Sequence, residues 1–95
     1  MGVTVYELLN MKHVNIIDIR PVQKYNDNHI PNSINIEFDK LISDPGKYIK
    51  KNEVYYVYCQ KGISSRKLVN YLRSLGYNVF DVLGGYESYI LNDKR

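Results

Sequence analysis

Cys59 begins a short loop whose residue types suit nucleophilic chemistry. The loop lies between an apolar run and an amphipathic one and reads Cys59-Gln60-Lys61-Gly62-Ile63-Ser64. A thiolate is an effective nucleophile, and a cysteine beside cations at a helix N-terminus ionises more readily than an isolated one. No acid occurs between Glu53 and Asp81, whereas this segment carries the cations Lys61, Arg66, Lys67 and Arg73. We therefore expect Cys59 to attack an anionic substrate, although free cysteines are more often small buried hydrophobes.

The elements on either side of the loop place Cys59 after a strand and before a helix. Residues 54–58 are aromatic and β-branched, which is typical of a buried strand. After the loop, apolar residues recur at helical spacing up to Leu75, and Gly76 follows as a stop signal. In open α/β sheets, ligands bind where a strand ends and a helix begins, because the first N–H groups of the helix lack partners. The loop is therefore positioned to bind an anion.

The rest of the chain alternates short strands with helical patterns, which predicts β-α-β crossovers. Strands are expected at residues 15–19, 33–36 and 78–82, and helical segments at residues 21–25, 38–42 and 86–91. Thr4 and Glu7 fit a capping box that opens a further short helix. Asp44, Pro45 and Gly46 predict a break before the central strand. We expect a small α/β domain with four to five mostly parallel strands flanked by helices.

Four stretches occur in a recognisable order along the chain. They are Asp18-Ile19-Arg20, His29-Ile30-Pro31-Asn32-Ser33-Ile34-Asn35-Ile36, the loop continued through Ser65-Arg66, and Gly84-Gly85-Tyr86-Glu87-Ser88-Tyr89. Each is similar to a signature of the rhodanese-like domains, the sulfurtransferase family, and together they are distributed over nearly the whole chain. Asn28 and Asn32 stand where the family usually has glycines, and asparagine tolerates left-handed backbone. Tyr89 replaces the usual tryptophan.

The resemblance implies that residues 1–95 form a single rhodanese-like domain with sulfurtransferase activity. Cys59 would be the catalytic residue. It would take a sulfane sulfur from thiosulfate or a persulfide donor and pass it, as a Cys59 persulfide, to a thiol or cyanide acceptor. The acceptor thiol can belong to a protein, and no cofactor is implied. The substrate would bind the loop through Gln60, Lys61, Gly62, Ile63, Ser64, Ser65 and Arg66.

The loop residues have distinct expected roles. Gly62 allows a tight curve, so that successive N–H groups cradle the negative charge of the outer sulfur. Lys61 steers the anionic donor toward the loop. Ser64 and Ser65 either donate hydroxyl hydrogen bonds or cap the following helix, which is the commoner role for serine. Arg66 either adds positive potential or lies in solvent.

Asp18, Arg20 and His29 are interpreted as scaffold residues. Asp18 and Arg20 project from the same face of a strand and can pair with each other, because strand side chains alternate. The resemblance places His29 in a turn where a ring nitrogen hydrogen-bonds to backbone. Sulfur transfer by a thiolate needs no neutralising base, so His29 is not expected to act in catalysis.

Two other functions stay open. Cysteine phosphatases and arsenate reductases of related fold place an arginine where Ser65 stands here, because six residues, Gln60 to Ser65, separate Cys59 from Arg66. This count favours sulfur over phosphate. The other alternative is a non-enzymatic sulfur carrier or regulatory rhodanese-like module. The sequence has no second cysteine to take the sulfur from Cys59, so an outside acceptor must do so.

Composition limits the setting and the partners. The 95-residue chain has a formal net charge of +3, one cysteine and two histidines. A single cysteine excludes an internal disulfide, and the isolated histidines predict no metal site. The mild charge without basic runs argues against nucleic acid. No apolar stretch approaches the length needed to span a bilayer and the start has no signal segment, so we expect no membrane association and a cytoplasmic, reducing location.

Overall fold

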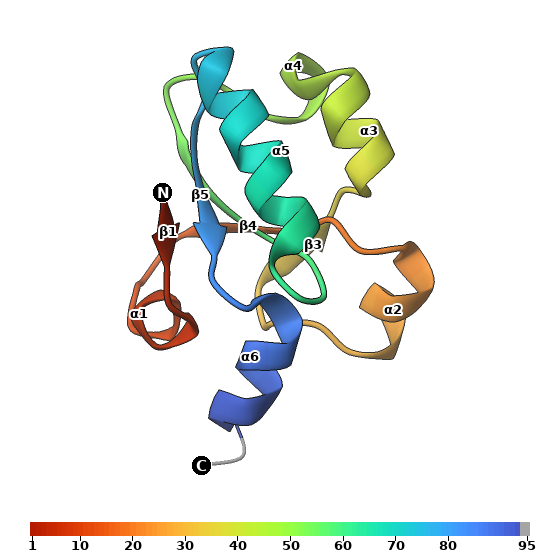
Figure 1. Ribbon diagram of the computed structural model, residues 1–95, viewed down its shortest axis with the longest axis vertical. Coiled ribbons are helices and arrows are strands. Elements are labelled where there is room, and N and C mark those ends of the chain that lie inside the picture. The colour runs from red at the N-terminus through yellow and green to blue at the C-terminus, as the bar shows by residue number, and fades with distance from the viewer. Residues whose placement is uncertain (94–95) are drawn as a thin grey trace.

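A central parallel sheet with helices on both faces forms the framework of the protein (Figure 1). The computed structural model describes residues 1–93, so the last two residues of the expected 1–95 domain lie outside the described part. Within it, the strand order is β1-β5-β4-β2-β3. The strands are β1 (Gly2–Val3), β2 (Asn15–Asp18), β3 (Ser33–Asn35), β4 (Val54–Tyr58) and β5 (Asn78–Val82). All the pairings are parallel, which confirms the predicted α/β fold.

The helices cover the two faces of the sheet in separate groups. They are α1 (Val5–Leu9), α2 (Val22–Asp27), α3 (Phe38–Ser43), α4 (Pro45–Tyr48), α5 (Ile63–Ser74) and α6 (Gly85–Asp93). Leu41 of α3 and Leu68 of α5 pack with Val57 in one core. Leu8 of α1 and Tyr86 of α6 pack in the other. Because both faces are buried, the strands are apolar along most of their length.

Several local predictions are confirmed. The hydroxyl of Thr4 accepts the N–H of Glu7 over 3.0 Å, and the N–H of Thr4 donates to Oε1 of Glu7 over 2.9 Å, which completes the capping box. Gly76 has a φ of 97° just after α5, as a helix stop requires. Asn32 adopts the left-handed backbone with a φ of 70°.

Other local predictions are wrong in detail. Asn28 is extended, with a φ of −171°, so it does not replace a left-handed glycine. The break near Asp44 is real, but Pro45 at once begins α4, since its fixed φ suits the first turn of a helix. Pro21 precedes α2 rather than lying within it. β1 was not predicted, because a strand of two residues has no periodicity to detect.

Candidate active site

Cys59 follows β4 directly, at the edge of the sheet where the parallel strands end. Its side chain is 8% exposed and its thiol is free. The loop that it begins lies between the end of β4 and the start of α5, close to the first turn of α6 (Figure 1). The predicted placement of Cys59 at the carboxyl end of a central strand is therefore confirmed.

Two backbone N–H groups of the loop point at the Cys59 sulfur. Gly62 donates to Sγ over 3.2 Å and Ser65 over 3.3 Å. Gly62 holds a left-handed φ of 89° immediately before α5, and a Cβ there would lie 2.9 Å from the backbone nitrogen of Gly84. Glycine is needed for this curve. Because N–H groups at a helix start carry partial positive charge, they stabilise negative charge on the sulfur.

Ser64 and Ser65 differ in their surroundings. Ser65 is fully buried and its hydroxyl donates to Oδ1 of Asp81 over 2.5 Å, while its oxygen lies 3.3 Å from Sγ of Cys59. Ser64 is exposed. No side chain caps the start of α5, where Gly62 occupies the cap position. The capping role considered for the two serines is therefore wrong, and Ser65 takes the hydrogen-bonding role.

Asp81 is a buried member of the site that the sequence prediction missed. It lies in β5, is 3% exposed and shares the inward face of the strand with Val79. Burial raises the pKa of Asp81, and the hydrogen bond from Ser65 with the positive charges of Arg66 and the Met1 amino group lowers it only in part. The sequence signal that could have identified Asp81 is its position two residues after Val79. Alternate residues of a strand face the same side, so an acid at this position is expected to be buried with a polar partner.

The turn at Gly84 and Gly85 packs against the backbone of the active loop. The N–H of Tyr86 donates to the carbonyl of Cys59 over 2.8 Å, and the N–H of Glu87 donates to the carbonyl of Gln60 over 3.0 Å. A Cβ on Gly85 would overlap the carbonyl oxygen of Cys59. The two glycines thus allow a close approach of the two backbones, which fixes the position of the Cys59 main chain.

Asp18 and Arg20 form a buried ion pair behind the loop. Nη2 of Arg20 donates to Oδ2 of Asp18 over 2.7 Å, and Nη1 of Arg20 donates to Oε1 of Gln60 over 3.3 Å. The guanidinium also lies 4.0 Å from the centre of the Tyr86 ring. Burial lowers the pKa of Arg20, but hydrogen bonding and the charge of Asp18 outweigh burial and the pKa is raised. The predicted pairing is confirmed, and it extends to the active loop.

His29 has the scaffold contacts that were expected of it. Its Nδ1 lies 2.8 Å from the carbonyl oxygen of Tyr25, and its ring stacks on the Tyr25 ring with 3.8 Å between centres. The side chain thus ties the turn after α2 to the helix itself. The prediction that a ring nitrogen of His29 bonds to backbone is confirmed.

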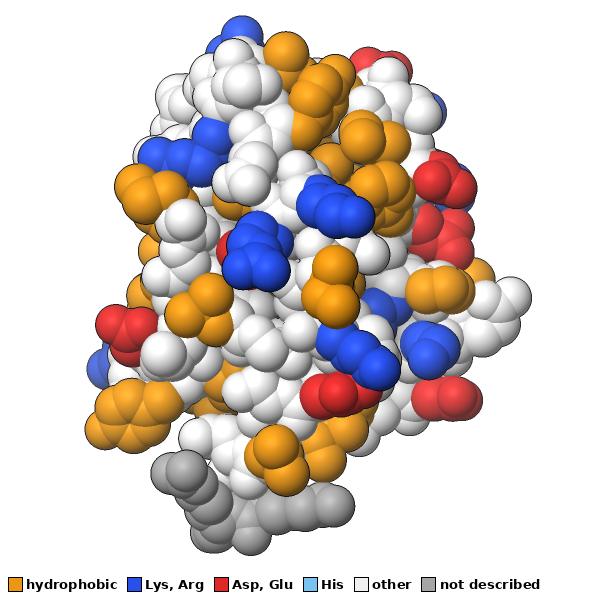
Figure 2. Space-filling model, in the orientation of Figure 1, with side chains coloured by type: hydrophobic (Ala, Val, Ile, Leu, Met, Phe, Trp, Pro, Cys, Tyr) orange, Lys and Arg blue, Asp and Glu red, His pale blue; other side chains and the backbone are white. Residues whose placement is uncertain are grey.

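A shallow hollow opens the loop to solvent. Its lining consists of Cys59, Gln60, Lys61, Ile63 and Ser64. An adjoining hollow shares Cys59 and adds Arg20, Lys24 and Phe38. Lys61, Arg66 and Lys67 are exposed, and Figure 2 shows Lys and Arg side chains gathered on the face that carries α5. Most of the predicted loop residues therefore surround the thiol, while Arg66 projects outward from the first turn of α5.

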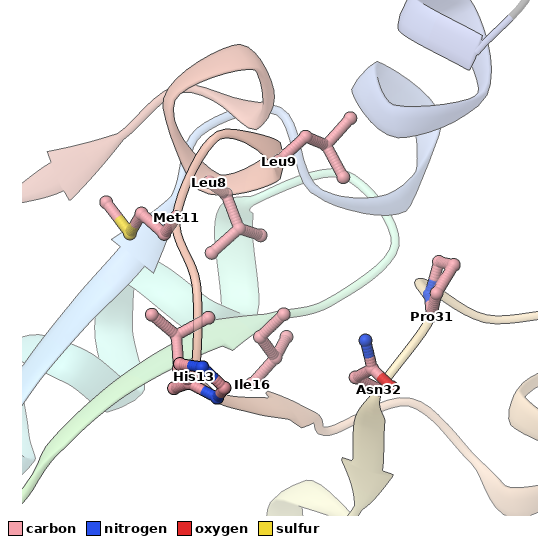
Figure 3. Close-up of a pocket in the computed structure, with 8 residues that line it drawn as sticks. Leu8, Leu9, Met11, His13, Ile16, Pro31 and Asn32 are labelled. Carbon is pink, nitrogen blue, oxygen red and sulfur yellow. The ribbon is translucent and has the colours of Figure 1, made fainter.

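A second hollow lies between α1, the segment that enters β2 and the turn before β3 (Figure 3). It is lined mainly by apolar side chains, with His13 and Asn32 as polar members: Leu8, Leu9, Met11, His13, Val14, Ile16, Pro31 and Asn32. It shares no lining residue with the hollows at Cys59, and no cysteine lines it. The candidate active site is therefore the loop.

Metal-binding clusters and membrane-spanning helices are both absent from residues 1–93. No three side chains of His, Cys, Asp or Glu in this range come together as a metal ion would require. No helix in the same range has both the length and the apolar character that a bilayer crossing needs.

Comparison with known proteins gives consistent matches over most of the chain. The model of the rhodanese-like domain family matches residues 3–92. Thiosulfate sulfurtransferase GlpE of Coxiella burnetii is 32% identical over 85 residues, which cover 88% of this chain and 78% of that protein. Adenylyltransferase and sulfurtransferase uba4 of Ogataea parapolymorpha is 36% identical over 84 residues, but the match spans 87% of this chain and only 22% of that protein.

A solved structure agrees with the fold described above. The crystal structure of a rhodanese-related protein from Thermoplasma volcanium superposes with a TM-score of 0.87 at 32% identity, covering 96% of this chain and 91% of that one. The family resemblance of the four sequence stretches is thus confirmed by sequence and by fold. The chain belongs to the rhodanese-like domain family.

Proposed function

We propose that this chain is a sulfurtransferase that carries a sulfane sulfur as a persulfide on Cys59. The observation that supports this most directly is the pair of N–H groups, from Gly62 and Ser65, aimed at Sγ from 3.2 and 3.3 Å in a loop that opens to solvent. Two relatives are named as sulfurtransferases, and one of them as a thiosulfate sulfurtransferase. We also propose that residues 1–95 act as one domain in a reducing, cytoplasmic setting, where the thiol stays available.

In the first step, the Cys59 thiolate attacks the sulfane sulfur of thiosulfate. The bond between the two sulfur atoms of thiosulfate breaks, sulfite leaves with the electron pair, and Cys59 becomes a persulfide. With a persulfide donor, the leaving group is a thiolate. The exposed cations Lys61 and Arg66 favour the approach of an anionic donor. Gln60, Ile63 and Ser64 form the wall that the donor contacts, and Gly62 and Ser65 hold the sulfur through their N–H groups.

In the second step, an acceptor attacks the outer sulfur and Cys59 leaves as a thiolate. A thiol acceptor becomes a persulfide, and cyanide becomes thiocyanate. Cys59 is the one cysteine of the sequence, so the acceptor is an outside molecule or protein. The same N–H groups that favour the first thiolate also favour its return as a leaving group.

The test is the intact mass of the protein after incubation with thiosulfate or with a persulfide donor, and then with cyanide. We expect a gain of one sulfur atom, and its removal by cyanide, because Cys59 forms a persulfide that cyanide can attack. Cys59→Ser is the matched control and should gain nothing. A chain that gains no sulfur from either donor, while its thiol remains alkylatable, would contradict the proposal. Loading by thiosulfate that is far slower than transfer from a partner protein would instead indicate a carrier.

A further inference from the structure

A row of hydrogen-bonding side chains leads from the thiol into the core. Sγ of Cys59 lies 3.3 Å from the hydroxyl oxygen of Ser65, which lies 2.5 Å from Oδ1 of Asp81. The three residues are buried, with exposed fractions of 8%, 0% and 3%. Cys59 follows β4, Ser65 lies in the first turn of α5, and Asp81 lies in β5. Three elements that meet at the edge of the sheet therefore each supply one group.

The hydroxyl of Ser65 has one proton, so it can donate to only one of its two neighbours at a time. In one arrangement, the Cys59 thiol donates to Ser65 and the Ser65 hydroxyl donates to the carboxylate of Asp81. In the other, a protonated Asp81 donates to Ser65 and the hydroxyl donates to the Cys59 thiolate. Both arrangements hold the same number of protons. They differ in whether the ionisable proton is bonded to sulfur or to the carboxyl oxygen.

We propose that Asp81 is a positioning residue that accepts the Cys59 proton through the hydroxyl of Ser65. The thiol proton passes to Oγ of Ser65 while the Ser65 proton passes to Oδ1 of Asp81, so one S–H bond breaks and one O–H bond forms, without oxidation or reduction. The thiolate and the neutral carboxyl thus form together. The relevance to sulfur transfer rests on the proposed function, because the proton that Cys59 and Asp81 share is the one whose loss from sulfur makes its nucleophile.

The surroundings of Asp81 suit a group that exchanges a proton. Two positively charged groups act on Asp81: the guanidinium of Arg66 on α5 and the amino group of Met1. Met1 directly precedes β1, the strand that pairs with β5. Asp81 belongs to neither of the ion pairs among the described residues. A buried carboxylate without a cation in contact is costly, and burial accordingly raises the pKa of Asp81. Taking up the thiol proton removes that cost.

The first experiment measures how the rate of Cys59 alkylation by iodoacetamide depends on pH. The single cysteine makes this rate a direct report of the thiolate. In Asp81→Asn the side chain has no negative charge and cannot take up the thiol proton, so a buried carboxylate no longer opposes the negative charge on the sulfur. We expect the midpoint of the curve to fall by about one pH unit, with roughly tenfold faster alkylation on the acidic side. Asp44→Asn changes an exposed acid and should leave the curve unchanged.

Ser65→Ala tests whether the effect passes through the hydroxyl. Alanine keeps the backbone N–H that donates to the sulfur but removes the hydroxyl between Cys59 and Asp81. In this background, adding Asp81→Asn should move the midpoint clearly less than it does in the parent chain, because coupled residues are not additive. Equal shifts in the two backgrounds, or no shift in Asp81→Asn, would overturn the proposal.

A second measurement requires no mutation of Asp81, so it does not depend on whether a variant folds. Carbon-13 NMR follows the side-chain carboxyl of Asp81 against pH in the parent chain and in the chain with Cys59 already alkylated. We expect the carboxyl signal of the parent to change again in the pH range where the thiol ionises, because the two groups share a proton. Alkylation should abolish that second change. Identical carboxyl titrations would overturn the proposal. Neither measurement uses a sulfur donor, so failure of the proposed function is detected separately by the mass experiment.

Discussion

At the scale of single residues, the loop is supported by a buried ion pair. Asp18 is fully buried and Arg20 is 4% exposed, and the arginine reaches both its partner carboxylate and Gln60 of the loop. The other ion pair of the described residues, Lys50 with Glu53, is separated by 3.9 Å and has side chains 75% and 45% exposed. Water screens the exposed pair, whereas the buried one has exchanged water for protein partners.

Asp18→Asn should reduce the free energy of unfolding by roughly 3–5 kcal/mol, because the guanidinium of Arg20 is left buried without its carboxylate. Urea denaturation of the parent and the variant measures this loss. Glu53→Gln, which removes the exposed pair, is the matched control and should cost less than about 1 kcal/mol. If Asp18→Asn were as stable as this control, the buried pair would have no role in holding the loop.

At the scale of elements, the turn between β5 and α6 determines the backbone of the loop. Gly84 and Gly85 have left-handed φ values of 76° and 61°, and the N–H groups that follow donate to the carbonyls of Cys59 and Gln60. The loop is therefore fixed at its carbonyls by α6 and at its sulfur by its own N–H groups. Displacement of this turn would therefore change the hydrogen bonds to the loop carbonyls and those to the sulfur together.

Gly85→Ala should destabilise the fold by at least about 1–2 kcal/mol, since a Cβ at a left-handed φ is strained and would also overlap the carbonyl of Cys59. Chemical denaturation gives the loss of stability, and sulfur loading gives the effect on the loop. Gly46→Ala is the control, because a Cβ there meets only the Tyr77 hydroxyl, at 3.3 Å. Parent-like stability and loading in Gly85→Ala would mean that the turn tolerates displacement.

The elements show why the sequence predicted some features and not others. β4, α5 and the Gly76 stop were predictable because each depends on local residue types and their spacing. The role of Ser65 was not, because it depends on Asp81, which follows it by 16 residues and meets it only through the packing of α5 on β5. The contact of Arg20 with Gln60 is of the same kind, since Gln60 follows Arg20 by 40 residues. Local pattern predicts elements, whereas side-chain partners across elements require the fold.

At the scale of the whole molecule, positive charge is gathered around the opening to the thiol. The net charge is only +3, but Lys24, Lys61, Arg66 and Lys67 are exposed on α2, the loop and α5. Lys24 and Lys61 line the two hollows that meet at Cys59. An uneven distribution of this kind raises the local concentration of small anions more than the net charge suggests.

Lys61→Glu should slow the alkylation of Cys59 by the anion iodoacetate by roughly threefold or more at low salt, while the rate with neutral iodoacetamide changes little. The ratio of the two rates, measured at several salt concentrations, isolates the electrostatic effect. Lys12→Glu makes the same charge change before β2, at the opposite edge of the sheet, and should leave the ratio near the parent value. An equal effect of both substitutions would indicate that net charge, and not its position, controls anion approach.

The pairing of β1 with β5 has a consequence for the order of assembly during synthesis. Gly2 lies beside Asp81, and the N–H of Asp81 donates to the carbonyl of Met1 over 3.0 Å. Contacts between residues so far apart in sequence form late, because the intervening chain must first be made and closed. On the ribosome, Cys59 therefore emerges well before β5 can join the sheet. A nascent chain carries its thiol in an unfinished loop, and the hydrogen bonds around Cys59 are completed only when β5 and the start of α6 have joined the fold.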